Sequence, residues 1–186
     1  MQATAPPARA CHVVFSHGKE SGPWGAKILA MSEVAKAGGF TVDSIDYQGL
    51  DDPAARVAKL VAAIDHAAVP LLLVGSSLGG HVCTAAAVHW AAKGSLNAAA
   101  PSPVHGVFLL APAFFMPGYE ALTPPVPPCP VEIVHGWHDE IVPVDHTLRW
   151  ARPAAVTVHL LDTDHRMHAA IDSINMLFAA FLKRFG

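Results

Sequence analysis

Short, continuously apolar segments alternate with Ala-rich segments along this chain, and this alternation restricts the fold more than any other feature. Runs such as LLLVG at residues 71–75 show no polar alternation, which is typical of strands covered by helices on both faces. Strands are predicted at residues 11–16, 40–46, 70–75, 104–110, 131–135 and 155–161. Helices are predicted at residues 24–38, 53–67, 77–92, 145–151 and 167–185. The sequence therefore predicts an α/β fold, with a single doubly wound, mainly parallel sheet of about six strands flanked by helices.

The length and the apolar content fit one domain. A chain of 186 residues with 52% apolar residues can bury a single core, and we expect this domain to span residues 11–186. Residues 1–10 lack an apolar segment and contain two prolines, so a flexible N-terminus is expected there rather than a secretory signal. Residues 112–130 include the run TPPVPPCP and are expected to form a partly ordered connecting loop.

Charge and composition argue against several classes of protein. A net charge of −3 and an isoelectric point near 6.4 leave no broad basic surface for nucleic acid or anionic lipid. No apolar run reaches the length of about 18 residues that a membrane span requires, so no span is expected. The cysteines are odd in number and lack a C-x-x-C spacing, which indicates a reducing compartment and predicts a cytoplasmic location.

The chain contains 12 histidines but no recognisable metal-binding pattern. Neither H-E-x-x-H nor a Cys/His set with ligand spacing occurs, and His168 is expected to be an exposed helix residue. We therefore predict no metal ion and no other cofactor. A catalytic cysteine is the less favoured alternative, because Cys11, Cys83 and Cys129 lie in or beside apolar runs.

The motif GSSLG at residues 75–79 is the strongest chemical signal. It follows a predicted strand and opens a predicted helix, which is the context that a G-x-S-x-G nucleophile turn requires. Ser77 is the predicted nucleophile, because Ser76 in the same role would need a glycine at Val74. The alternative is a glycine-rich turn without chemistry.

A serine nucleophile needs a base and an acid that orients the base. Asp139 follows the predicted strand at residues 131–135, and His165 follows the one at residues 155–161. Carboxyl ends of parallel strands share one edge of a sheet, so we predict that His165 is the general base and Asp139 the orienting acid. Glu140 and Asp164 are the rival acids.

Three motifs occur in a fixed order: G-x-S-x-G at residues 75–79, G-x-x-D-x-x-V-P at residues 136–143 and D-H at residues 164–165. This set resembles the α/β-hydrolase superfamily. The chain is similar to the small, lidless bacterial esterases of the YqiA type, through H-G at residues 17–18 and GSSLGG at residues 75–80. More distantly, it is similar to the mitochondrial acyl-protein thioesterase and acyl-glucuronide esterase branch, through CPVEIVHGWHDEIVPVDH and DHRM. The resemblance implies a minimal fold without a large cap and with an open or thinly covered site.

The resemblance also indicates which backbone amides would stabilise an oxyanion. Leu78, the residue after the nucleophile, would supply one amide at the start of a helix. By its similarity to the H-G-x loop of the family, the segment at residues 15–19 would supply the amide of Lys19. His17 and His81 lie near these loops and could contact substrate, but a structural role is expected for each. Apolar residues flanking the loops could line an acyl pocket or belong to the core: Trp24, Phe114, Phe115, Trp137, Ile141 and Met167.

The leading hypothesis is a serine hydrolase that cleaves a small-molecule acyl ester or thioester through an acyl-enzyme. A peptidase or amidase could use the same three residues. A ligand-binding or signalling protein could also keep the fold without turnover, because a fold alone does not fix a function.

Overall fold

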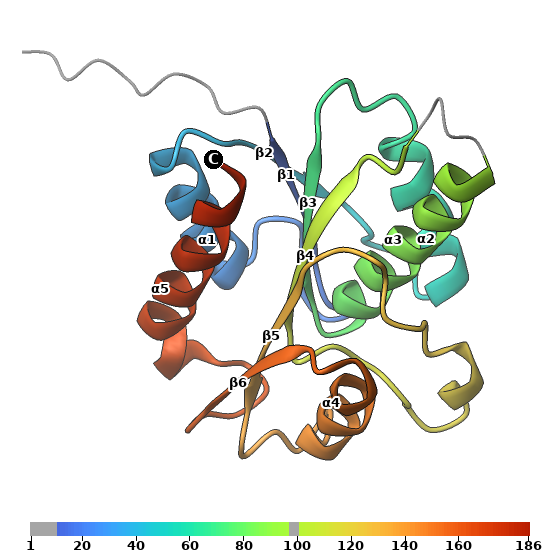
Figure 1. Ribbon diagram of the computed structural model, residues 1–186. Coiled ribbons are helices and arrows are strands. Elements are labelled where there is room, and N and C mark those ends of the chain that lie inside the picture. Colours follow the sequence, from blue (N-terminus) through green and yellow to red (C-terminus); the bar gives the residue numbers. More distant parts are fainter. Residues whose placement is uncertain (1–10, 97–100) are drawn as a thin grey trace, which may run out of the picture.

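A computed structural model describes residues 11–96 and 101–186 and contains one six-stranded sheet (Figure 1). The strands are β1 (His12–Ser16), β2 (Thr41–Ile45), β3 (Leu71–Ser76), β4 (Val104–Leu110), β5 (Val131–Gly136) and β6 (Thr157–Leu161). Their order is β2-β1-β3-β4-β5-β6, and each neighbouring pair is parallel. The predicted doubly wound α/β fold is confirmed.

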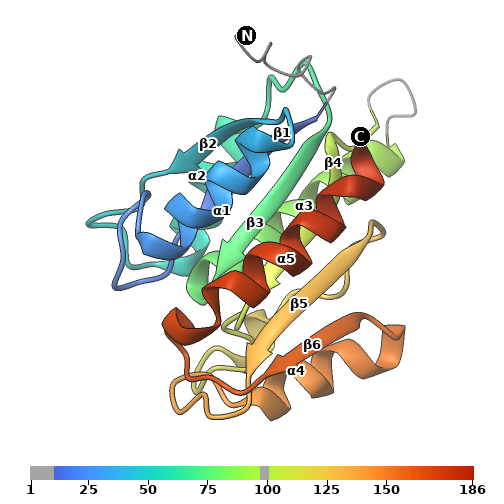
Figure 2. The same cartoon turned by 90° about the vertical axis from the view of Figure 1, so that its left-hand side faces the viewer.

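Helices cover both faces of this sheet. Helices α1 (Ala26–Ala37) and α5 (Ile171–Leu182) lie on the face seen in Figure 2, and α2 (Pro53–Ala63), α3 (Leu78–Leu96) and α4 (Val144–Ala151) lie on the other. The short 3-10 helices are η1 (Glu120–Leu122), η2 (Arg152–Ala154), η3 (His168–Ala170) and η4 (Lys183–Phe185). Among the described residues, no helix combines the length and the apolar character needed to cross a membrane.

The central strand β3 shows why the apolar runs are continuous. Leu71 and Leu73 belong to the core between the sheet and helices α2, α3 and α4, whereas Leu72 and Val74 belong to the core under α1 and α5. Side chains alternate across a strand, and these four are at most 3% exposed. Because both faces are buried, neither face of β3 carries polar residues.

Several helix boundaries differ from the sequence prediction, and turn geometry accounts for two of them. A helix is predicted from residue 167, but Met167 has a left-handed φ of 56°, and α5 begins at Ile171 after η3. The helix predicted at residues 53–67 ends at Ala63, because Ile64 leaves helical geometry. Ala-rich composition favours a helix at both places, so turn geometry overrides the local propensity.

The Pro-rich segment, residues 112–130, is anchored on α4. Phe114 stacks on Trp150 with ring centroids 4.5 Å apart. Trp150 Nε1 donates a hydrogen bond of 2.7 Å to the carbonyl of Pro124. The segment follows β4, at the sheet edge where the carboxyl ends of the parallel strands meet, and it is held there by packing as well as by its prolines.

Candidate active site

Ser77 lies on a tight turn between β3 and α3 and has a left-handed φ of 54°. This conformation is strained for a residue with a side chain. The Ser77 amide donates to the Leu110 carbonyl at 2.9 Å, and the Ser77 carbonyl accepts from the amides of Gly80 and Ala113. Backbone contacts with the neighbouring strand and loop therefore hold the turn in its strained form.

The two glycines of the motif allow this turn to pack closely. A Cβ atom on Gly79 would overlap the carbonyl oxygen of Ser16 at the end of β1. A Cβ atom on Gly75 would overlap the carbonyl oxygen of Gly79. Only glycine fits at either position, so the motif reflects the close approach of α3 to β1 and β3.

The structure brings Ser77, His165 and Asp139 together in one hydrogen-bonded chain. The Ser77 Oγ atom lies 3.1 Å from His165 Nε2, and His165 Nδ1 lies 2.7 Å from Asp139 Oδ2. Because an ionised carboxylate can only accept, Nδ1 carries a proton and Nε2 is free to accept the hydroxyl proton of Ser77. The imidazole is thus the tautomer that a general base requires.

The loops that carry Asp139 and His165 meet because Gly136 has no side chain. A Cβ atom on Gly136 would overlap the carbonyl oxygen of Thr163. The amide of His138 donates to that same carbonyl at 3.1 Å. The ends of β5 and β6 are thereby tied together, and this tie fixes the spacing of the acid and the imidazole.

Asp139 is held as a carboxylate. Burial alone would raise its pKa, but hydrogen bonds from His135, His165 and the Val142 amide outweigh burial and hold the pKa well below its usual range. The Oδ1 atom accepts from the amides of Ile141 and Val142 at 2.9 and 2.7 Å. These donors fix the orientation of the carboxylate toward His165.

The rival acids are placed differently. Glu140 is exposed. Asp164 is also exposed, and its Oδ1 atom accepts the Met167 amide at 2.9 Å, where it stabilises the turn before η3. Of the three predicted candidates, Asp139 is the acid bonded to His165.

Behind the segment at residues 15–19, buried polar side chains fix the backbone. The Gly18 carbonyl accepts from His17 Nδ1 at 2.7 Å and from Arg56 Nη1 at 3.3 Å. Because the carbonyl and the following N–H of a trans peptide point in opposite directions, the Lys19 amide is directed away from Arg56. A Cβ atom on Gly18 would lie 3.4 Å from Ser77 Cβ, so this segment lies against the Ser77 turn.

The predicted Leu78 amide also lies at the turn. Leu78 is the first residue of α3, so its N–H has no acceptor inside the helix. Leu78 and Lys19 both line the cavity that contains Ser77 and His165. Both residues therefore lie at the site, beside the positive end of the α3 dipole. That their amides stabilise an oxyanion stays a prediction.

His17 is a structural residue, as predicted. It accepts the Tyr47 amide at Nε2 over 2.8 Å and donates from Nδ1 to Gly18. A ring nitrogen that accepts an amide carries no proton, so the ring is neutral. Burial, the largest cause, lowers its pKa. His81 of α3 differs, because it lines the cavity; burial lowers its pKa as well.

A cavity of about 680 Å³ opens over Ser77 and His165, within the size range of small-molecule sites. Of the six apolar residues predicted to flank the site, all of them described, Ile141 lines it. Phe114 and Met167 are core residues, while Trp24 and Trp137 are 42% and 53% exposed. The Pro-rich segment supplies apolar lining instead, through Met116, Pro117, Tyr119 and Leu122. Sequence reasoning missed these four, because a Pro-rich loop has no periodicity that shows which side chains face inward.

Lys27 is a further residue that sequence reasoning missed. It lines the cavity from α1, and its Nζ atom donates to the His165 carbonyl at 3.4 Å. Burial lowers its pKa, against the opposing effect of Asp139 and Asp164. Lys27 supports the backbone of the histidine loop, which is the segment at residues 162–167 between β6 and η3. In residues 11–96 and 101–186, no group of three or more His, Cys, Asp or Glu side chains is placed to hold a metal ion.

Comparison with solved structures identifies the family. A hydrolase of the alpha/beta superfamily from Xanthomonas campestris is 31% identical, with 93% of this chain and 98% of that one covered and a TM-score of 0.75. Alpha/beta hydrolase domain-containing protein 10 from mouse is 22% identical over 94% and 90% of the chains, at a TM-score of 0.73. Est1E from Butyrivibrio proteoclasticus is 16% identical, with 96% of this chain and 89% of that one covered and a TM-score of 0.76. No protein-family model and no curated protein matches the chain. The likeness to the Xanthomonas protein shows that this chain is a member of the α/β-hydrolase superfamily.

Proposed function

We propose that the protein is a serine hydrolase that cleaves carboxylic ester or thioester bonds. The observation that carries this proposal is the bonded chain from Ser77 to His165 to Asp139, with distances of 3.1 and 2.7 Å, at the wall of a small-molecule cavity. The proposed substrate is a small molecule whose acyl group lies against the apolar residues of the Pro-rich segment.

In the proposed reaction, Ser77 Oγ attacks the carbonyl carbon of the substrate while His165 Nε2 takes the hydroxyl proton. The amides of Leu78 and Lys19 stabilise the tetrahedral oxyanion. The ester or thioester bond then breaks, and His165 returns the proton to the leaving alcohol or thiol. Water, activated by His165, attacks the acyl-enzyme and releases a carboxylic acid and free Ser77.

Two further observations support this assignment. Burial raises the pKa of the Cys83 thiol to about 12 and that of Cys129 to about 11, so neither is a ready thiolate nucleophile. Ferulic acid, a carboxylic acid, is bound to Est1E in a solved structure with a TM-score of 0.73 to this chain. A carboxylic acid is the product class of the proposed reaction.

The three free cysteines also support the proposed cytoplasmic location.

The test is hydrolysis of chromogenic esters and thioesters of increasing acyl length, with matched anilides, by the wild type, Ser77→Ala and Ser76→Ala. Ser76 lines the same cavity and has no role in the proposed reaction, so its variant is the matched control. Ester or thioester turnover that persists in Ser76→Ala and disappears in Ser77→Ala is expected. Turnover confined to anilides would indicate an amidase. Absence of turnover with all substrates would favour a ligand-binding protein.

A further inference from the structure

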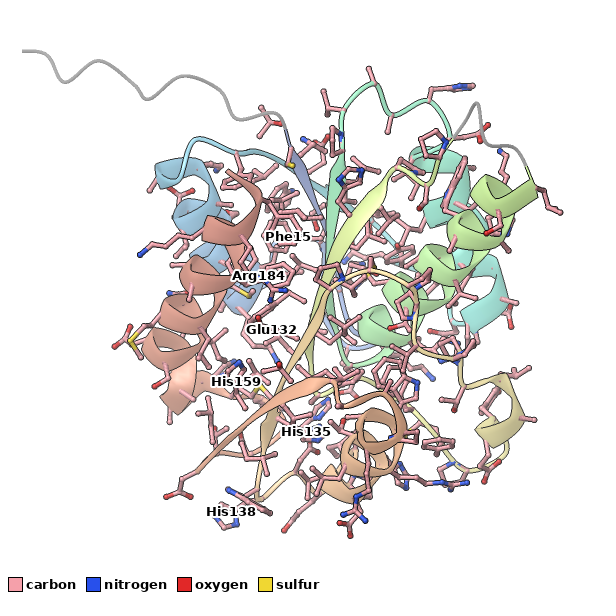
Figure 3. The ribbon with its side chains drawn as sticks, in the orientation of Figure 1. Phe15, Glu132, His135, His138, His159 and Arg184 are labelled. Atoms are coloured by element: carbon pink, nitrogen blue, oxygen red, sulfur yellow. The ribbon has the colours of Figure 1, made fainter. Side chains whose placement is uncertain are left out.

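A second histidine, His135, lies behind Asp139 and is fully buried, with 0% exposure. Figure 3 shows it between β5 and α4, whereas His138, three residues later, lies at the periphery. His135 Nε2 is 3.1 Å from Asp139 Oδ2 and 2.9 Å from the Val142 carbonyl. His135 Nδ1 is 2.8 Å from Thr147 Oγ1 on α4. The bonded chain of the site therefore continues through Asp139 to His135 and Thr147.

The partners of His135 determine where its protons lie. A carbonyl oxygen can only accept, so Nε2 carries a proton that the Val142 carbonyl and Asp139 Oδ2 share. In the neutral ring, Nδ1 accepts the hydroxyl proton of Thr147. In the protonated ring, Nδ1 donates to Thr147 instead. In both states, His135 presents a donor to the same carboxylate oxygen that His165 uses.

The position of His135 in the fold indicates a role beyond packing in the core. On β5, His135 shares a face with Ile133, whose surroundings in this core include Trp150 and Ala151. A polar ring buried on an apolar face is costly unless its hydrogen bonds are made. Here both ring nitrogens are bonded, and one bond reaches the proposed acid.

We propose that His135 is a positioning residue that acts through Asp139 to set how strongly His165 holds its catalytic proton. The proposal rests on the proposed function. Asp139 Oδ2 divides its hydrogen-bonding capacity between two imidazoles, which weakens its hold on the protonated form of His165. Unprotonated His165 is therefore available as a base at lower pH than it would be if Asp139 Oδ2 accepted a hydrogen bond from His165 alone.

The direction of the effect is the same for both charge states of His135. Removing a neutral His135 frees Oδ2 for His165 alone, and removing a cationic one also removes a repelling charge. Each change favours protonated His165. Other titratable or charged groups lie around Asp139 and His165. They include Lys27 from α1, Asp164, Arg166 and His168 in or after the segment that carries His165, His81 from α3, Glu140 beside Asp139, and Lys19, Glu20 and Asp51 across the cavity. All of them remain in the variants below.

The experiment is the pH dependence of kcat/KM for an ester, measured for the wild type, His135→Leu, His135→Gln and the control His138→Gln. The concentration of active sites in each preparation is set by titration with a stoichiometric phosphonate, which removes effects of misfolded protein. In His135→Leu, the acid limb should move up by about one pH unit, or about tenfold in kcat/KM on that limb. His135→Gln, which retains a donor, should restore most of the wild-type profile, and His138→Gln should match the wild type.

If the acid limb of His135→Leu is unchanged after correction for the concentration of active sites, the proposal is overturned. Should that variant not fold, Thr147→Val replaces it, because loss of the Thr147 hydroxyl frees the His135 ring and should move the limb in the same direction. An unmoved acid limb in Thr147→Val would then overturn the proposal. Failure of the proposed function is distinct, because the wild type itself would show no ester turnover.

Discussion

At the scale of single residues, the carboxylate of Asp139 has a fixed orientation that a generic buried acid lacks. Its Oδ1 atom accepts two backbone amides, and its Oδ2 atom accepts two imidazoles. Such a set of donors keeps the group ionised in spite of burial. The acid is therefore ready to stabilise an imidazolium without moving.

Asp139→Asn should retain the fold but lose turnover by several orders of magnitude, roughly 10⁴-fold by analogy with other serine hydrolases. The amide nitrogen of asparagine cannot accept the His165 Nδ1 proton, so the imidazole loses its orientation and its tautomer. Ester hydrolysis and circular dichroism together measure the effect. Exposed Glu140→Gln is the matched control, and near-normal turnover in Asp139→Asn would contradict the assignment.

His17 predicts how stability depends on pH. Burial lowers its pKa in the folded protein, whereas the unfolded chain takes up a proton on this residue below about pH 6.5. The free energy of unfolding should therefore fall as the pH drops through that range. His17→Gln, which cannot titrate, should flatten this dependence between about pH 7.5 and 5.5 in urea unfolding. A weaker pH dependence of the same sign should remain, because burial also lowers the pKa of His81. An equal slope in both proteins would refute this role for His17.

At the scale of helices and strands, the site depends on backbone approaches at the carboxyl ends of the strands. The start of α3 packs against the end of β1 at Gly79, and β5 meets the histidine loop at Gly136. Each approach joins two loops that carry site residues. The relative positions of these loops are thus set by the sheet and its glycines.

Gly79→Ala should destabilise the protein by roughly 3 kcal/mol or more, because the added methyl group overlaps backbone and α3 must shift. The shift should also displace Ser77 and lower ester turnover. Gly22→Ala is the matched control, since its Cβ atom would make an ordinary 3.5 Å contact with the Gln48 side chain. Urea unfolding of both variants is the measurement. A fully stable Gly79→Ala with normal turnover would contradict the close approach.

At the scale of the whole molecule, patterns within the sequence predicted the sheet and the linear motifs. Apolar runs and turn glycines are local signals, so the six strands and the positions of Ser77, Asp139 and His165 at strand ends could be read from them. Other features depend on contacts between distant segments. Arg56 supports a loop that is far from it in sequence, at His17 and Gly18. His135 bonds Asp139, Val142 and Thr147, which are nearer in the chain, but no spacing rule marks it. The inward side chains of the Pro-rich segment depend in the same way on its docking against α4.

The central claim is that Ser77 is a reactive nucleophile, and covalent labelling tests it most directly. A fluorophosphonate is incubated with the wild type, Ser77→Ala and Ser76→Ala, and the adducts are measured by intact-protein mass spectrometry and peptide mapping. Attack by Ser77 Oγ displaces fluoride, so the account predicts a single adduct on Ser77 in the wild type and in Ser76→Ala, and none in Ser77→Ala. An unlabelled wild type, or an adduct that persists in Ser77→Ala, would contradict it.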